Sequence, residues 1–183
     1  MRDKIETLIA QNPHAVIGID GMAAAGKSTL AEELAEEFGG EVVHMDDFFL
    51  PAELRTDERL SEPGGNIHYE RFQREVALKI KEKRSFDYGV FDCSEMAVAE
   101  IKHIENKGLL IIEGAYCLRP EFRELYDLKV FMKIDGEAQL KRIIDRDGER
   151  KAEIFKDRWI PLETAYFETM DVEAAADVVI VSL

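Results

Sequence analysis

The sequence contains few of the residues that mark disulfide-rich, metal-binding or disordered proteins. Cys93 and Cys117 are its only 2 cysteines. They lie too far apart for a CxxC pair and have no histidines or cysteines clustered beside them, so we expect two buried, reduced thiols and no zinc site. Only 5 of the 183 residues are proline, and there is no low-complexity run. This composition predicts an ordered globular chain.

Long apolar runs and an excess of positive charge are also missing. No apolar stretch approaches the roughly 18 residues that would suggest a bilayer span, and residues 1–11 are too charged for the core of a signal peptide. We therefore expect a cytoplasmic protein with no membrane partner. The chain has 24 Lys and Arg against 38 Asp and Glu, a formal net charge of −14, which would repel a nucleic acid backbone. We expect no nucleic acid partner.

Apolar segments alternate with amphipathic ones along the chain. We expect strands near residues 15–19, 42–45, 109–112, 128–134 and 178–181. Helices are expected in a short N-terminal segment that ends before residue 12, and near residues 27–38 and 69–80. Residues 86–90 alternate as an edge strand or hairpin arm does, whereas polar residues 51–66 are predicted to form a loop. Strands that read as continuous apolar runs between helices predict an α/β fold with a mostly parallel sheet covered by helices on both faces. The length fits one domain over residues 1–183.

One motif points to a specific ligand. Gly21-Met22-Ala23-Ala24-Ala25-Gly26-Lys27-Ser28 satisfies G-x-x-x-x-G-K-[ST] between an expected strand and an expected helix. Its glycines allow backbone N–H groups to wrap a phosphate, and the helix N-terminus favours an anion. Lys27 is expected to reach the β- and γ-phosphates of ATP, and the Ser28 hydroxyl to bind Mg²⁺. The motif predicts a P-loop NTPase fold of three layers, with nucleotide contacts from Gly21, Ala23, Ala24, Ala25, Gly26, Lys27, Ser28 and Thr29.

Carboxylates follow two of the expected strands. Asp46 and Asp47 come after residues 42–45, and Glu113 comes after residues 109–112. Ligands of open α/β sheets bind at the carboxyl ends of strands, so these acids should surround the phosphates. We interpret Asp46 as the base for an attacking hydroxyl and a neighbour of the metal, and Glu113 as a ligand of Mg²⁺ or of its waters. The alternatives are a turn or N-cap role for Asp46 and a solvated loop carboxylate for Glu113.

A dense charged segment at residues 141–150 is expected to form most of a lid over approximately residues 141–155. There Arg146 would stabilise the transferring phosphoryl group, with Arg142 and Arg150 as further candidates. For the latter two, a solvated helix face with i,i+4 ion pairs remains the alternative. A GTPase is disfavoured, because the nearest match to the guanine signature N-K-x-D, residues 106–109, lacks the aspartate.

Beyond the P-loop, further segments resemble the uridine kinase and phosphoribulokinase family of P-loop kinases: residues 45–49, 66–68, 86–88, 112–114 and 140–147. The resemblance implies ATP- and Mg²⁺-dependent transfer to a hydroxyl of a uridine- or cytidine-like nucleoside or a related small metabolite. It implies Asp46 as the base, Arg146 on the phosphates, and Asp87 and Tyr88 in an acceptor-side region of approximately residues 46–92. Residues 90–94 lack the histidine and arginine that uridine kinases usually place near the pyrimidine.

The remaining acceptor-side expectations are less specific. His68 is a candidate for a sugar contact, with a surface or capping role as the alternative, and Trp159 is expected to anchor the core. A nucleoside monophosphate kinase would need additional arginines, for which Arg55, Arg59 and Arg71 are available. A non-kinase ATP-binding regulatory protein and a homo-oligomer also remain open. The predicted substrate-side residues are Asp46, His68, Asp87, Tyr88, Glu113 and Arg142.

Overall fold

A five-stranded parallel sheet forms the centre of the protein in a computed structural model that describes residues 1–182. The strand order is β2-β5-β1-β6-β7, and every neighbouring pair is parallel. The strands are β1 (Val16–Gly21), β2 (Glu41–His44), β5 (Leu110–Glu113), β6 (Leu128–Ile134) and β7 (Val178–Ser182). The predicted α/β fold with a mostly parallel sheet is confirmed.

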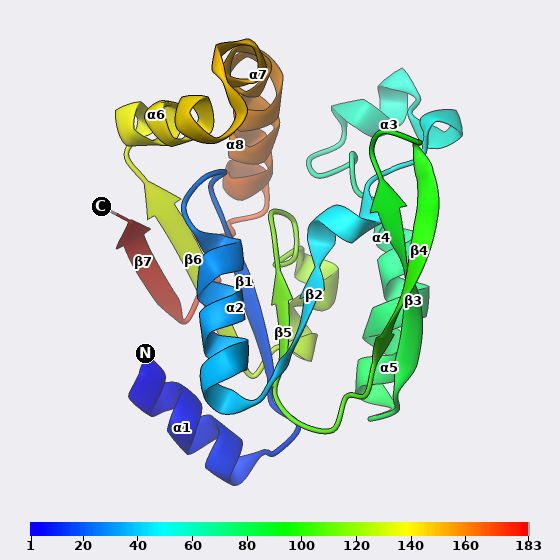
Figure 1. Cartoon of the computed structure of the whole chain (residues 1–183), viewed down its shortest axis with the longest axis vertical. Coiled ribbons are helices and arrows are strands. Elements are labelled where there is room, and N and C mark those ends of the chain that lie inside the picture. Colours follow the sequence, from blue (N-terminus) through cyan, green and yellow to red (C-terminus); the bar gives the residue numbers. More distant parts are fainter. Residues whose placement is uncertain (183) are drawn as a thin grey trace.

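Helices cover both faces of this sheet (Figure 1). On one face, α1 (Arg2–Gln11) and α2 (Lys27–Phe38) bury Ile5 and Leu34 against alternate residues of the strands, such as Ile17. On the other face, a continuous helical stretch made of α4 (Tyr69–Phe72), a π-helical turn (Gln73–Ala77) and α5 (Leu78–Lys81) buries Phe72 and Val76. The period-two alternation of the strands thus divides the apolar residues between two cores.

A separate antiparallel hairpin stands beside the sheet. It pairs β3 (Phe86–Asp92) with β4 (Ala97–Ile104), so of the two alternatives for residues 86–90, an edge strand or a hairpin arm, the structure has the hairpin arm. The preceding polar stretch is less irregular than predicted, because it contains a 3-10 helix (Ala52–Leu54) and a short α3 (Asp57–Ser61). Thr56 caps α3, since its side-chain oxygen accepts a hydrogen bond from the Arg59 backbone N–H.

The predicted lid lies in a helical arm above the tips of the strands (Figure 1). The arm comprises α6 (Gly136–Asp147), α7 (Glu149–Ile154), a π-helical turn (Phe155–Trp159) and α8 (Ile160–Thr169). Gly148, with φ of 84°, separates α6 from α7 in a conformation that favours glycine. The arm is therefore positioned over the edge of the sheet where ligands of such folds bind.

Two further expectations can be compared with the structure. Cys117 is buried as predicted, but the prediction for Cys93 is wrong: it is exposed just past β3, where the chain turns toward β4. Within residues 1–182, no helix has the length and apolar character needed to cross a bilayer.

Candidate active site

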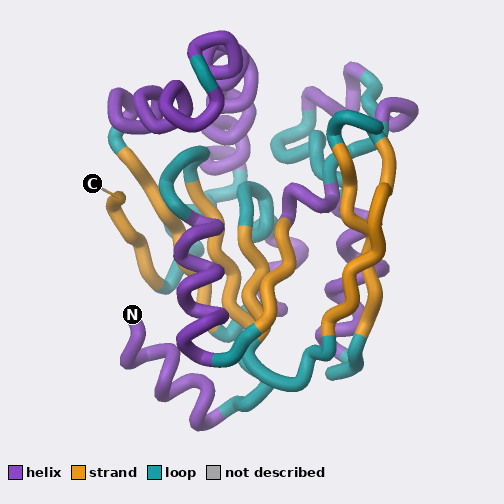
Figure 2. Tube along the Cα trace, in the orientation of Figure 1, coloured by secondary structure: helices purple, strands orange, loops and turns teal. Residues whose placement is uncertain are grey.

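The loops at the carboxyl ends of β1, β2 and β5 lie at one end of the sheet, between the helical arm and the hairpin (Figure 2). They enclose a cavity of about 850 Å³, here called the main pocket. Its wall includes residues from the P-loop, the first turn of α2, the end of β5, the hairpin and the helical arm. These segments are far apart in the sequence, and the parallel sheet brings them together.

The P-loop has the backbone shape that phosphate binding requires. Gly21 has a φ of 138°, and a Cβ there would lie 2.0 Å from the Met132 carbonyl oxygen, so only glycine fits. The Lys27 ammonium donates hydrogen bonds to the carbonyls of Gly21 at 2.8 Å and Met22 at 2.9 Å, which holds it over the loop. The predicted residues Ala23, Ala24, Gly26, Lys27, Ser28 and Thr29 line the main pocket, while Gly21 and Ala25 are buried and do not line it.

Two of the predicted carboxylates face the same pocket. Asp46 lies in a 3-10 helix (Met45–Phe48) directly after β2, and Glu113 is the last residue of β5. Asp46 is an exposed residue at the pocket wall. Desolvation by the protein around its carboxylate raises its pKa, as does the charge of Glu113, while Lys27 opposes this rise. Glu113 is paired with His44, whose Nδ1 lies 2.5 Å from Oε1, and this hydrogen bond raises the pKa of His44.

The donor set in the pocket suits magnesium. Ser28, Asp46 and Glu113 share the wall of the main pocket, and Mg²⁺ is typically held by one or two protein carboxylates together with phosphate oxygens and waters. In the described part of the chain, no group of three or more His, Cys, Asp and Glu side chains could hold a metal. Ser28, Asp46 and Glu113 would supply at most three ligand groups, so phosphate oxygens and waters would complete the coordination of Mg²⁺.

Glu163 is a pocket residue that the sequence analysis missed. This buried α8 side chain accepts a hydrogen bond of 2.9 Å from the P-loop N–H of Ala23. Burial raises its pKa to about 7, although Lys27 and the Ala23 N–H oppose the shift. A signal was present in the sequence: with Ile160 and Tyr166 at helical spacing on either side, Glu163 places an acid on an apolar helix face.

A second carboxylate that the sequence analysis missed, that of Asp20, connects the segments around the P-loop. Asp20, the fully buried residue before Gly21, accepts hydrogen bonds from the Leu118 N–H at 2.9 Å and the Tyr166 hydroxyl at 2.8 Å. Burial raises the pKa of Asp20, while the bond from Leu118 opposes this. Asp20 thereby links β1 to the loop after β5 and to α8.

Tyr88 was predicted to line the acceptor pocket, but it lies behind the wall. Its buried hydroxyl donates a 2.9 Å hydrogen bond to the carboxylate of Asp47, and Arg71 donates to the Asp47 carbonyl and, at 2.6 Å, to the Gly89 carbonyl. Burial raises the pKa of Asp47, against the effect of the bond from Tyr88. These contacts fix the 3-10 helix that carries Asp46.

The arginines of the lid differ in their environment. Arg142 and Arg146 both line the main pocket. The Arg142 guanidinium donates to the Ala24 carbonyl at 3.1 Å, whereas Arg146 forms an ion pair of 2.7 Å with its neighbour Asp147. Arg150 is exposed on α7 and is absent from the pocket wall.

Besides Tyr88, two predicted substrate residues lie outside the main pocket, and one residue predicted to be core lies in it. Asp87 is 64% exposed and pairs with His103 across the hairpin at 2.6 Å, on the strand face opposite Tyr88. His68 borders a separate cavity of about 230 Å³, with its Nδ1 3.0 Å from Glu70. The core prediction for Trp159 is wrong, because its half-buried ring lines the main pocket.

Comparisons with known proteins show that the chain is similar to kinases. No family model matches the chain. The chain is 29% identical over 148 residues to a uridine kinase from Bacillus thuringiensis (strain Al Hakam), covering 74% of this chain and 68% of the relative. A structure described as a "Possible Uridine Kinase" from Bacillus stearothermophilus superposes with a TM-score of 0.63 and 23% identity over 97% of each chain.

A third similarity is structural only. D-glycerate 3-kinase from Cryptococcus neoformans has a TM-score of 0.58 and 13% identity, over 82% of this chain and 78% of that one. The structural similarities confirm the predicted P-loop fold. The curated relative confirms the resemblance to uridine kinases that the sequence motifs indicated.

Proposed function

We propose that this chain, a uridine kinase-like P-loop kinase, transfers the γ-phosphoryl group of ATP to a hydroxyl group of a nucleoside such as uridine or cytidine or of a related small metabolite. Its similarity to uridine kinases supports a phosphotransferase with an alcohol group as acceptor. The observation that carries the proposal is that Lys27 and Ser28 of the P-loop share one pocket with Asp46. Phosphoryl transfer requires these groups close together: phosphate and metal ligands on one side, and a base for the hydroxyl on the other.

In this proposal, each residue of the pocket has a separate role in the transfer. Asp46 accepts the proton of the attacking hydroxyl, and its raised pKa brings its proton affinity closer to that needed near neutral pH. Lys27 neutralises charge on the β- and γ-phosphates. Bound at Ser28, with Asp46 and Glu113 nearby, Mg²⁺ would supply charge neutralisation on the phosphate oxygens. Arg146 adds positive charge from the lid once it leaves its ion pair with Asp147, the next residue of α6.

The structure disfavours the alternative of a nucleoside monophosphate kinase. That enzyme class needs several cations around the acceptor phosphate. Two of the three candidate arginines already have protein partners: Arg59 pairs with Glu70 at 2.7 Å, and Arg71 with Glu75 at 3.2 Å. The second alternative is a non-kinase ATP-binding regulatory protein. Such a protein would not phosphorylate an acceptor, so an ADP-release assay distinguishes it from a kinase.

The test is a coupled ADP-release assay with Mg-ATP and uridine, cytidine, nicotinamide riboside or pantothenate as acceptor. We expect one acceptor class to raise ADP release well above the rate with ATP alone. Asp46→Asn should retain ATP binding and lose most turnover, whereas Lys27→Ala should abolish transfer. Equal turnover of Asp46→Asn and the parent would remove Asp46 as the base. ATP binding without stimulation by any acceptor would favour the regulatory protein.

A further inference from the structure

One arginine of the acceptor-side region has a side chain directed to the main pocket and no carboxylate partner. We propose that Arg55 binds an acidic group, one carboxylate or one phosphate, on the molecule whose hydroxyl is phosphorylated. The inference rests on the proposed kinase function and narrows it, because neutral nucleosides lack such a group. Arg55 would thus determine acceptor specificity.

The position of Arg55 is fixed by its own backbone and by one hydrogen bond. It follows the 3-10 helix Ala52–Leu54 and precedes Thr56, the cap of α3. Its Nε donates to the Leu50 carbonyl at 2.7 Å, which orients the guanidinium plane. Within residues 1–182, no hydrogen bond or ion pair involves its two terminal nitrogens, so four N–H donors remain for a ligand.

The other arginines of residues 46–92 are committed to the protein. Each has a carboxylate partner: Arg59 with Glu70, Arg71 and Arg74 with Glu75, and Arg84 with Glu82. In a chain with 38 acidic and 24 basic side chains, such pairing is the expected state of an arginine. The half-buried Arg55 is the exception among them, and it lies in the pocket wall.

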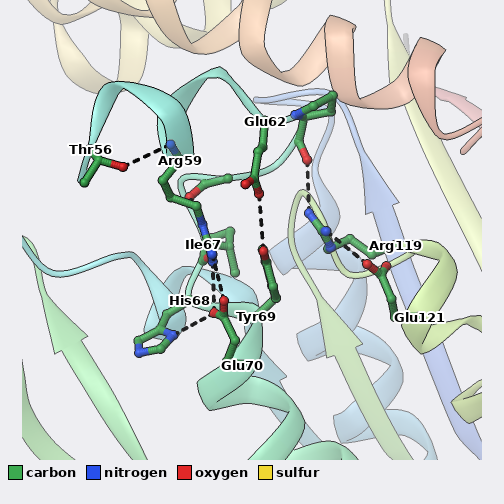
Figure 3. Close-up of polar contacts among 11 residues, drawn as sticks. Thr56, Arg59, Glu62, Ile67, His68, Tyr69, Glu70, Arg119 and Glu121 are labelled. Atoms are coloured by element: carbon green, nitrogen blue, oxygen red, sulfur yellow. Dashed lines mark hydrogen bonds and ion pairs between the residues drawn. The ribbon is translucent and has the colours of Figure 1, made fainter. Parts of the chain in front are cut away.

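Figure 3 shows two arginines, Arg59 and Arg119, whose donors are bound to other residues of the protein. Arg59 donates to the carbonyls of Gly65 and Ile67 as well as to Glu70. Arg119 donates to the Pro63 carbonyl and to Glu121. Their guanidinium groups also lie 3.9 Å and 4.2 Å from the centre of the Tyr69 ring. These two side chains hold the loop together and have little capacity left for a ligand.

Arg55 lines the main pocket together with the proposed base, Asp46. The same wall includes Phe49, Cys93 and Trp159. Desolvation and the charge of Asp46 raise the pKa of the Cys93 thiol, while Arg55 lowers it, so both charged groups act on the same thiol. A molecule that places its hydroxyl at Asp46 can therefore extend toward Arg55.

Charge explains why an acidic acceptor would need this arginine. The pocket wall carries four acidic side chains, Glu32, Asp46, Glu113 and Glu163, which would repel an anionic acceptor. Of its four basic side chains, Lys27 and Arg146 are assigned to the nucleotide phosphates and Arg142 is bonded to the P-loop, which leaves Arg55. A guanidinium group offers two parallel N–H donors that match one carboxylate or one phosphate, and it is always charged. With one uncommitted arginine in the acceptor-side region, the site is suited to a single acidic group.

The test uses pairs of acceptors that differ only in the acidic group: D-glycerate and glycerol, pantothenate and panthenol, ribose 5-phosphate and ribose, with uridine as a neutral nucleoside. We expect ADP release with the acidic member of at least one pair and little with its neutral partner. Arg55→Gln should raise the KM for that acceptor roughly tenfold to a hundredfold with a smaller change in kcat, because a hydrogen-bonded charge is lost. Arg55→Lys should recover part of the loss. Arg84→Gln, an exposed arginine paired with Glu82, is the matched control and should behave as the parent.

Binding gives a readout independent of turnover. Trp159 is the single tryptophan and lines the same pocket as Arg55, so its fluorescence can be titrated with each compound in the presence of Mg-ADP. Acid-specific binding that is lost in Arg55→Gln, without ADP release, would support the anion site and remove the kinase proposal. Turnover of neutral acceptors alone would overturn the anion site and leave the kinase proposal intact. An unchanged KM of an acidic acceptor in Arg55→Gln would also overturn it.

Discussion

The buried carboxylate of Glu163 makes the stability of this protein depend on pH in a defined direction. Its pKa rises from an ordinary 4.5 to about 7 in the folded state, mainly because of burial. Between these values the folded chain keeps the proton and the unfolded chain releases it, so the free energy of unfolding falls as pH rises. At 1.36 kcal/mol per pKa unit, the ionised carboxylate costs about 3 kcal/mol above pH 7.

Glu163→Gln removes this cost without removing the hydrogen bond, because the amide oxygen of glutamine can still accept from the Ala23 N–H, which lies 2.9 Å from the carboxylate. Linkage applied to the two pKa values gives a penalty of roughly 1 kcal/mol in the parent at pH 5 and about 3 kcal/mol at pH 8. We therefore expect the substitution to be about 2 to 3 kcal/mol more favourable at pH 8 than at pH 5.

The assay is urea unfolding of parent and variant at both pH values, compared through their midpoints and slopes. Asp20 and Asp46 also have raised pKa values, but they are present in both proteins and cancel to first order in the difference. Glu168→Gln, an exposed carboxylate on the same helix α8, is the control. If Glu163→Gln changed the stability equally at pH 5 and pH 8, the argument that burial raises the pKa of Glu163 would be wrong.

The remaining predictions concern the backbone, the buried network and the lid. Gly21→Ala should destabilise the protein by several kcal/mol or prevent folding, because the new Cβ would meet the Met132 carbonyl at 2.0 Å; thermal unfolding measures this, and a melting temperature near that of the parent would refute it. Tyr166→Phe should cost about 1 to 3 kcal/mol in urea unfolding, since the buried Asp20 loses a hydrogen bond; no loss would mean that another donor replaces the hydroxyl. Arg146→Gln should lower kcat at least roughly tenfold with little change in folding. An unchanged kcat would show that Arg146 does not contribute to phosphoryl transfer.

The parts of the site that depend on local sequence were predictable. The P-loop lies within eight consecutive residues, and its strand and helix are adjacent in the chain. The carboxylates Asp46 and Glu113 were located from the ends of two strands, because parallel strands place their carboxyl ends at one edge. Glu163 could not be found in this way, since its contact with Ala23 joins positions 140 residues apart.

The error at the hairpin has a different physical origin. Asp87 and Tyr88 were assigned to the acceptor pocket together, but neighbouring side chains on a strand point to opposite faces. Phe86 and Tyr88 are both buried, which leaves Asp87 on the exposed face with His103. The apolar alternation in the sequence contained this information, and applying it would have separated the two residues.

The helical arm holds the P-loop through hydrogen bonds and also carries Arg146, the proposed catalytic cation. The positions of the P-loop and of Arg146 are therefore mechanically linked. Gln139 on α6 donates to the Ala23 carbonyl at 3.0 Å, and Arg142 donates to the Ala24 carbonyl, while Glu163 on α8 accepts from the Ala23 N–H. Arg146 lies four residues after Arg142, so the anchor and the cation share one face of α6 a single turn apart. Because transfer depends on placing charge accurately on the phosphoryl group, a shift of α6 that moves Arg146 must also strain or break a bond to the loop that holds the nucleotide.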